Sequence, residues 1–189
     1  MNRRTFLASS AVTATAATLT TEAKAGPNER VRVGFVGVGG RALSLVRTFS
    51  DNRNVEVVAM ADVDTRKFAV ALDEVQKRQN RKARTMQDFR RLIDDKEIDA
   101  LVVGTPDHWH AIPTILGCLA GKDVYVEKPD GHNMEEGKRM VAAMRRNRRI
   151  VQMGSQHRST TRMQSALEFL RTGALGKCLV AKAWESSRQ

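Results

Sequence analysis

Cysteine is nearly absent from this sequence, and this scarcity excludes a disulfide-stapled scaffold. The 189 residues include two cysteines, Cys118 and Cys178, which lie far apart in the chain. We expect two buried free thiols, one on a helix and one on a strand, rather than a bridge. No cysteine or histidine spacing typical of a metal site occurs, so the sequence predicts no bound metal.

Aromatic residues are also scarce, whereas basic residues are in excess. Aromatics make up 5% of the chain with a single tyrosine, and 32 Lys and Arg against 21 Asp and Glu give a net charge of +11. Such an excess could attract nucleic acid nonspecifically. However, the bases are scattered over the predicted helices, and the few aromatics leave no platform on which nucleobases could stack. We therefore expect a solvated basic surface around an anionic cofactor, and no nucleic-acid partner.

The third shortage is of long apolar runs, and it excludes a membrane span, which needs about 20 apolar residues. Residues 1–25 have instead the order of an export signal. The pair Arg3-Arg4 precedes Phe6-Leu7, a weakly apolar Ala/Thr/Val segment follows, and Ala23-Lys24-Ala25 forms an A-x-A cleavage site. We expect export of the folded protein to the periplasm by the twin-arginine pathway, with cleavage after Ala25.

The most informative stretch runs from Val31 to Ala42 and reads VRVGFVGVGGRA. A β-branched apolar run ends in glycines, and a helical pattern follows them, as in a dinucleotide-binding unit. Gly37 allows the tight turn, Gly39 lets the backbone approach a pyrophosphate, and the small Ala42 stands where helix and strand pack closely. The start of the helix offers unpaired N–H groups to the phosphates.

A carboxylate at the end of the next apolar run strengthens this interpretation. The run from Val55 ends at Asp62, 25 residues after Gly37, which is near the spacing of the acid that binds the adenosine ribose. A carboxylate at this position accepts a hydrogen bond from the ribose 2′-hydroxyl and repels a 2′-phosphate. The sequence therefore predicts NAD as the cofactor in preference to NADP.

Apolar strand patterns alternate with helical patterns along the chain, which predicts an α/β fold with a Rossmann-type, doubly wound parallel sheet. Ligands of such sheets bind outside the carboxyl ends of the strands. We expect a signal peptide over 1–25, a cofactor domain over 26–155 and the start of a second α/β domain over 156–189. The predicted strands cover 31–36, 55–62, 98–104, 123–129, 149–153 and 177–184, with 81–85 a short strand or loop. The predicted helices cover 43–50, 65–79, 86–94, 110–120, 135–147 (capped near Asn133) and 160–170.

Five motifs in this order resemble the Gfo/Idh/MocA oxidoreductases, the relatives of glucose–fructose oxidoreductase and inositol dehydrogenase. They are GFVGVGGR at 34–41, ADVD at 61–64, GTPDHWHA at 104–111, EKP at 127–129 and GSQHRS at 154–159. The resemblance implies a Rossmann domain followed by an α/β domain with an open, largely antiparallel sheet that commonly mediates homo-oligomers. It also implies hydride transfer between a sugar, cyclitol or polyol carbon and a tightly held nicotinamide cofactor.

The resemblance assigns roles to individual residues of this chain. Lys128 matches the lysine that points at the substrate hydroxyl, and an ammonium there can polarise that hydroxyl or help take up its proton. His108 and His110 could suggest a metal pair, but no carboxylate or cysteine set accompanies them, so packing or cofactor contact is preferred. The expected cofactor-binding residues are Gly37, Gly39, Gly40, Arg41, Asp62, Thr105, Pro106, His110, Glu127, Lys128 and Gln156.

One departure from the family pattern concerns the second domain. The catalytic histidine of the family belongs to an Asp-x-x-x-His motif, but residues 156–189 contain no aspartate and His157 as their single histidine. We therefore expect a chain that lacks most of the catalytic second domain. Two alternatives stay open: a glycoside hydrolase of the same superfamily that uses bound NAD transiently, and a non-catalytic nucleotide-binding module.

Overall fold

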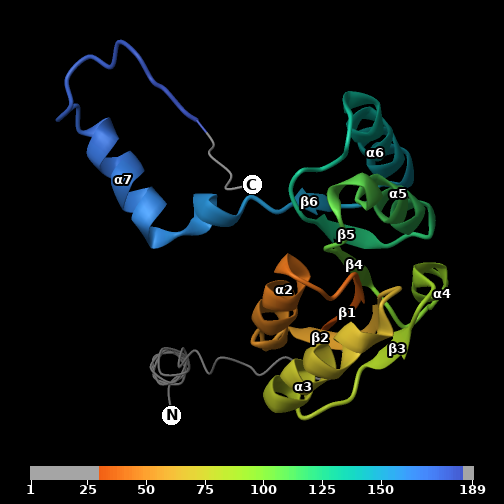
Figure 1. Ribbon diagram of the computed structural model, residues 1–189. Helices are drawn as coiled ribbons and strands as arrows, with labels where there is room; N and C mark the ends of the chain where they lie inside the picture. Colours follow the sequence, from red (N-terminus) through yellow and green to blue (C-terminus); the bar gives the residue numbers. More distant parts are fainter. Residues whose placement is uncertain (1–29, 185–189) are drawn as a thin grey trace, which may run out of the picture.

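A computed structural model describes residues 30–184 of the 189 residues. The predicted signal peptide, residues 1–25, lies outside the described residues, so its role as an export signal stays a prediction. Within the described part, six parallel strands form one sheet in the order β3-β2-β1-β4-β5-β6 (Figure 1). The strands are β1 (Val31–Val36), β2 (Val55–Ala61), β3 (Arg84–Met86), β4 (Ala100–Val103), β5 (Asp123–Val126) and β6 (Val151–Met153).

The strand order reverses between β1 and β4, which are hydrogen-bonded neighbours in the sheet although β2 and β3 lie between them in the sequence. At such a reversal the connections leave toward opposite faces of the sheet and open a crevice at the carboxyl ends of the strands. The predicted doubly wound parallel sheet is confirmed, and its ligand crevice lies above the glycine turn that follows β1.

Helices cover both faces of the sheet, as Figure 1 shows. One face packs against α2 (Arg41–Ser50) and α3 (Phe68–Gln79), with Phe35, Val46 and Met60 among its fully buried side chains. The other face packs against α4 (Phe89–Ile93), α5 (Ala111–Leu119) and α6 (Met134–Asn147). Two apolar cores on either side of β1 and β4 explain why these central strands are apolar on both faces.

Local sequence signals set several helix ends. The side chain of Asn133 accepts a hydrogen bond from the Glu136 amide at 3.0 Å, which confirms the predicted cap of α6. Pro113 is the third residue of α5, where a missing N–H costs nothing. The helix predicted from Met86 begins later, at Phe89. Met86 is the last residue of β3, where it pairs with Ala61 of β2, and Asp88 caps α4.

The segment after β6 differs most from the prediction. Residues 156–159 form a short 3₁₀ turn, α7 (Thr161–Arg171) follows, and no residue of α7 is buried. The predicted strand over 177–184 is not formed, since no described strand lies beside it to accept its backbone hydrogen bonds. Cys178 is therefore exposed, against our expectation of two buried thiols, whereas Cys118 on α5 is fully buried as predicted.

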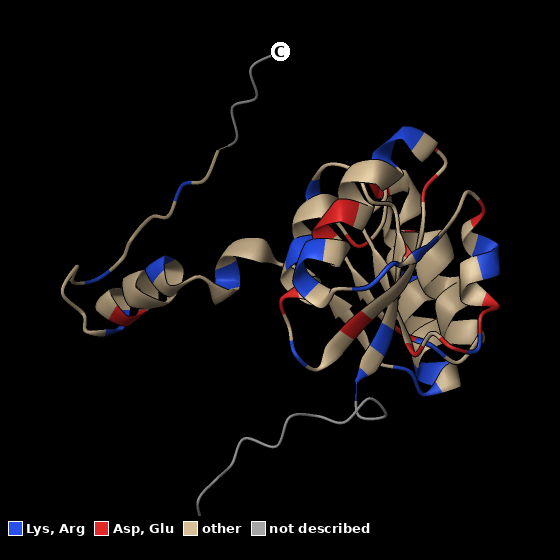
Figure 2. Cartoon of the chain, turned by 90° about the horizontal axis from the view of Figure 1, so that it is seen from below, with Lys and Arg blue, Asp and Glu red and all other residues tan. Residues whose placement is uncertain are grey.

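The surface of the described part carries mixed charge. Figure 2 shows Lys and Arg interspersed with Asp and Glu over the helices and loops around the sheet. No helix between residues 30 and 184 is long and apolar enough to cross a membrane. Binding to nucleic acid is not tested by this distribution, and its absence stays a prediction.

Candidate cofactor site

A cavity of about 530 Å³ lies at the carboxyl ends of the strands, above the β1–β4 reversal. Seven of the eleven predicted cofactor residues line it: Gly37, Gly39, Gly40, Arg41, Asp62, Thr105 and Pro106. Four others, namely His110, Glu127, Lys128 and Gln156, lie outside the lining. Residues from three separate loops thus meet in one cavity, because parallel strands direct all their following loops to the same edge of the sheet.

The glycine turn after β1 has no room for a side chain at Gly37. Gly37 has a φ of +84°, and a Cβ there would lie 3.0 Å from the carbonyl carbon and oxygen of Gly104. A Cβ on Gly104 would in turn lie 2.6 Å from the Cβ of Ala42, which explains why a small residue stands at position 42. Gly40 has a φ of +51° and begins α2 without a side-chain cap or an acidic residue in the first turn. The start of α2 therefore offers its positive dipole end to an anion.

Asp62 connects the glycine turn to the end of β2. Its Oδ2 accepts a hydrogen bond from the Val38 amide at 3.0 Å, and its Oδ1 accepts one from the Asp64 amide at 2.9 Å. The ammonium of Lys67 lies 3.4 Å from the same Oδ1. The carboxylate is nearly buried, with 6% of its side chain exposed. Asp62 consequently holds two turns in place as well as standing where the ribose acid is expected.

His110, which is 1% exposed, holds the loop after β4 in place through its ring nitrogens. Nε2 of His110 lies 2.8 Å from the carbonyl oxygen of Thr105, and Nδ1 contacts the carbonyl oxygen of Pro129. A neutral imidazole carries one N–H, so it donates to one of these two carbonyls at a time. His110 therefore joins the cavity loop to the loop that carries Lys128.

Glu127, at the end of β5, is buried and accepts hydrogen bonds from two side chains and one amide. The donors are Nε of Arg41 at 3.1 Å, the hydroxyl of Tyr125 at 3.4 Å and the backbone amide of Lys128 at 3.3 Å. Burial, and next the neighbouring Glu127 carboxylate, raise the pKa of Tyr125. The phenol therefore keeps its proton and stays a donor to Glu127.

Lys128 itself is exposed, and its ammonium makes no ion pair with the described residues. An unpaired ammonium at a strand end is available to a substrate hydroxyl, in the role that the family resemblance implies. Gln156 begins the 3₁₀ turn after β6 with a φ of +36° and lies on the same edge of the sheet. The roles of both residues stay predictions.

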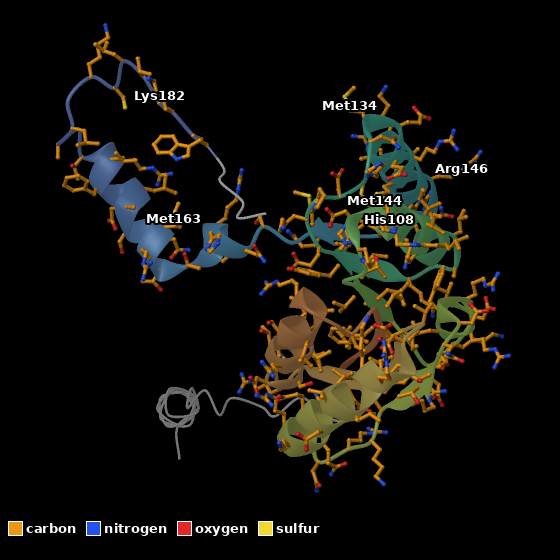
Figure 3. The ribbon with its side chains drawn as sticks, viewed as in Figure 1. His108, Met134, Met144, Arg146, Met163 and Lys182 are labelled. Atoms are coloured by element: carbon orange, nitrogen blue, oxygen red, sulfur yellow. The ribbon has the colours of Figure 1, made fainter. Side chains whose placement is uncertain are left out.

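Several residues that the sequence did not single out also line the cavity. Gln87 follows β3 and donates to the Val63 carbonyl at 3.2 Å, and the rings of Phe89 and Trp109 meet edge to face at 6.5 Å. The rule that loops follow the strand ends would have identified Gln87, but a helix predicted from Met86 concealed it. Besides the predicted cofactor residues, the lining consists of Val36, Ala61, Val63, Lys67, Gln87, Phe89, Gly104, His108, Trp109 and Pro113, of which His108 had been considered from the sequence. Figure 3 shows His108 on the body of the fold, well apart from Met163 on α7.

This cavity fits a dinucleotide. Gly37, Gly39 and Gly40 leave the backbone of the turn without side chains along the cavity, and the start of α2 provides a positive dipole end. The hydroxyl of Thr105 is buried without a hydrogen-bond partner in the described part of the chain, so it is free to bind a polar group of a ligand. Between residues 30 and 184, no group of three or more His, Cys, Asp or Glu side chains is arranged to hold a metal ion.

The fold and the cavity define an NAD-binding Rossmann domain of the oxidoreductase type. Comparison with known families gives the same result, because residues 31–155 match the family described as "Oxidoreductase family, NAD-binding Rossmann fold". The chain belongs to this family, Gfo/Idh/MocA. NAD is the cofactor of the family, as the sequence predicted.

Individual relatives agree with this assignment. The chain is 30% identical over 159 residues to the α-N-acetylgalactosaminidase of Shewanella oneidensis, covering 82% of this chain and 35% of that protein. Its fold is similar to that of myo-inositol 2-dehydrogenase from Lactobacillus plantarum, with 25% identity and a TM-score of 0.70 over 78% of this chain and 43% of the other. Scyllo-inositol dehydrogenase from Lactobacillus casei, solved with NAD(H) and scyllo-inositol, shares the fold at 20% identity and a TM-score of 0.68, over 78% and 42% of the two chains. The chain spans about a third of the length of the curated relatives it matches.

Proposed function

We propose that this chain is the cofactor-binding part of an NAD-dependent oxidoreductase that acts on a sugar, a cyclitol or a related polyol. The observation that carries the proposal is the single cavity in which the glycine turn, Asp62 and Thr105 meet at the carboxyl edge of the sheet. The inositol dehydrogenases of similar fold support the polyol as substrate class. A non-catalytic nucleotide-binding module is the alternative, and absence of turnover by the complete protein with every polyol tested would favour it.

Each part of the site has a role in this reaction. NAD, when bound, supplies the hydride acceptor. The start of α2 and the glycine turn bind the phosphates, and Asp62 accepts hydrogen bonds from the adenosine ribose. Lys128 orients the substrate hydroxyl and stabilises the negative charge that develops on its oxygen as the proton leaves. Glu127 and His110 fix the strand end and the loop on which Lys128 stands.

A fluorescence titration tests cofactor binding without any substrate. Trp109 lines the cavity, whereas Trp184 lies 83% exposed beyond α7. In a Trp184→Phe variant, Trp109 is the single tryptophan. Bound NADH should therefore quench the Trp109 fluorescence, and the nicotinamide should fluoresce through energy transfer from Trp109. A Trp109→Phe variant that keeps Trp184 is the matched control and should show no transfer. Saturable binding of NADH without any change in Trp109 emission would place the cofactor elsewhere and overturn the proposed site.

A second candidate activity is glycoside hydrolysis with transient use of bound NAD, in which the sugar is oxidised, the aglycone eliminated and the sugar reduced again. The observation in its favour is the similarity to the α-N-acetylgalactosaminidase of Shewanella oneidensis. Both activities begin with the same hydride transfer, so the cofactor site does not separate them. The complete protein would release a chromogenic aglycone without net NADH if it is a hydrolase. Net NADH formation in step with polyol loss would identify the oxidoreductase.

We also propose that the protein is exported through the twin-arginine pathway and that its complete form is a homo-oligomer. Export rests on the order of the Arg3-Arg4 pair, the apolar segment and the cleavage site after Ala25. A reporter protein fused after residue 25 should reach the periplasm, and the Arg3→Lys/Arg4→Lys double variant should retain it in the cytoplasm. The boundary between the cofactor domain and the second domain, placed at residues 155–156, is likewise proposed, since the match to the family ends at residue 155.

A further inference from the structure

The second half of α6 is a part of the described surface where basic residues have no acidic residues among them. Residues 137–150, from the middle of α6 to the residue before β6, contain six Lys and Arg and no Asp or Glu. Two of these six are paired, since Arg139 lies 3.0 Å from Glu135 and Arg149 lies 4.0 Å from Asp123. The other four are exposed and form no ion pair with any residue between 30 and 184; they are Lys138, Arg145, Arg146 and Arg148, here called the α6 basic cluster.

Apolar side chains are exposed among these cations. Val141 lies about one turn after Lys138 and one turn before Arg145, so the three share the outer side of α6. Val141 is 43% exposed, and Ile150, which follows the end of the helix, is 72% exposed. The inner side of α6 is buried by contrast, with Met140 in the core of the fold. The outer side of α6 thus combines unpaired cations with exposed aliphatic groups.

The arginines of the α6 basic cluster lie away from the cofactor cavity. β5 and β6 are parallel, so α6 returns from the carboxyl end of β5 to the amino end of β6. Nη1 of Arg149 donates to the Gly121 carbonyl at 3.0 Å, which holds the end of α6 beside the amino end of β5. Figure 3 shows Arg146 on α6, well apart from Met163 on α7. A surface bound to these arginines would therefore leave the cavity, at the carboxyl edge of the sheet, open.

The chemistry of the cluster fits phosphate groups on an extended anionic surface. Guanidinium groups bind phosphates through paired hydrogen bonds. A cluster of about four to eight Lys and Arg on an amphipathic helix is typical of proteins that bind anionic lipid headgroups. Nucleic acid is the other polyanion to consider, but residues 134–150 contain no aromatic side chain on which bases could stack. Exposed aliphatic side chains beside the cations favour a lipid surface, because they insert into its headgroup layer.

We propose that the α6 basic cluster is a docking surface for a membrane of anionic phospholipid. Arg145, Arg146 and Arg148 donate hydrogen bonds to the lipid phosphates, and Val141 and Ile150 enter the headgroup layer. Because the inner side of α6 is packed on the fold, the apolar contribution is small and the attraction is mainly electrostatic. The protein then rests on the membrane by the amino edge of its sheet, with the cofactor cavity facing the aqueous side.

Sedimentation with lipid vesicles tests the proposal. The whole chain should pellet at low salt with vesicles of phosphatidylcholine that contain about one-third phosphatidylglycerol, and should stay in solution with phosphatidylcholine alone. Binding should weaken steeply as salt is added, because ions screen surface charges. The Arg145→Gln/Arg146→Gln/Arg148→Gln variant should bind about 100-fold more weakly, which corresponds to about 5-fold per charge. Its affinity for NADH should not change, since none of the three arginines lines the cavity.

The Arg66→Gln/Lys77→Gln/Arg90→Gln variant is the matched control, because it lowers the net charge by the same amount. Each of these three cations is exposed, lies outside α6 and is paired with a nearby carboxylate. The control should bind the anionic vesicles within about 3-fold of the unmodified chain. Equal losses in the two triple variants would show that net charge alone drives binding, and would overturn a docking surface on α6.

A fluorophore at position 150 reports where the membrane touches the protein. In an Ile150→Cys/Cys178→Ser variant, an environment-sensitive label attaches at position 150, since Cys118 is buried. Its emission should shift to shorter wavelength on the anionic vesicles. Pelleting without this shift would mean that another segment, such as residues 1–25, contacts the lipid, and would overturn the proposal. Tighter binding to duplex DNA than to the vesicles, lost in the α6 triple variant, would overturn it as well, because the cluster would then be a nucleic-acid surface.

Discussion

The guanidinium of Arg41 lies 3.1 Å from the buried carboxylate of Glu127, although the two residues are 86 positions apart in the sequence. Arg41 is the first residue of α2, directly after the glycine turn, and Glu127 follows β5. The pair therefore spans the carboxyl edge of the sheet and connects the phosphate-binding turn to the segment that carries Lys128. Only 4% of the Glu127 side chain is exposed, so this carboxylate depends on its partners for its solvation.

Removal of Arg41 should destabilise the domain through the charge that it leaves behind. Breaking a buried ion pair costs about 3–5 kcal/mol. Because the side chain of Arg41 is 42% exposed, water can enter and solvate the Glu127 carboxylate after Arg41 is removed. We therefore expect Arg41→Ala to lower the free energy of unfolding by about 1–2 kcal/mol. Urea unfolding measures this change. The Arg41→Ala/Glu127→Gln double variant should recover part of the loss, because it leaves no buried charge. Strict additivity of the two single effects would show that the pair is not coupled.

His110 should be needed for the stability of the two loops that it joins. His110→Ala removes the hydrogen bond from the ring to one of the two loop carbonyls and leaves a cavity where the buried ring was, so we expect a loss of about 2–4 kcal/mol in the free energy of unfolding. His108→Ala is the matched control, because His108 is exposed and two residues away. It should change stability by less than about 0.5 kcal/mol. Equal effects of the two substitutions would contradict a structural role for the ring of His110.

Gly37→Ala should abolish NADH binding, and Gly121→Ala should not. Both glycines have positive φ values, +84° and +77°, so alanine at either position carries a backbone cost of about 1–2 kcal/mol. A Cβ on Gly121 would have no atom within 4 Å, whereas a Cβ on Gly37 would abut the backbone of Gly104. The comparison isolates the effect of close approach from that of backbone conformation. Retention of NADH affinity in Gly37→Ala would show that the turn does not bind the phosphates.

The two thiols should differ in reactivity toward an aromatic disulfide reagent at pH 8. Burial raises the pKa of the Cys118 thiol, so at a given pH the folded protein holds less of the reactive thiolate there. Cys178 is exposed and should react at once. We expect one thiol per chain to react rapidly in the folded protein and two in urea. Above about pH 8.5, the ordinary thiol pKa, the unfolded chain loses the proton of Cys118 while the folded protein keeps it, because the pKa is raised only in the folded state. The free energy of unfolding should therefore fall as the pH rises above this value. Rapid reaction of both thiols in the folded protein would show that α5 is not packed on the sheet.

What the sequence determined by itself is the backbone framework of this domain. The glycines at 37–40, the carboxylate ending the Asp62 strand, the Asn133 cap and the alternation of strands and helices are all local signals, because they reflect backbone geometry and burial over a few residues. Parallel strands then require that the loops after them share one edge, so the sequence alone predicts that Asp62 and Thr105 lie at the same edge.

Tertiary structure alone decided which side chains meet at that edge. The contacts of Arg41 with Glu127, of Lys67 with Asp62 and of His110 with two carbonyls depend on strand order and on the direction in which each side chain leaves its element, and no spacing in the sequence encodes either. The strand expected over 177–184 also depended on tertiary structure, because the sequence pattern does not show whether a neighbouring strand is present. Its alternating pattern describes a segment that is able to pair, but a β-strand exists only where a neighbouring strand supplies the hydrogen bonds, and none of the described strands lies beside it.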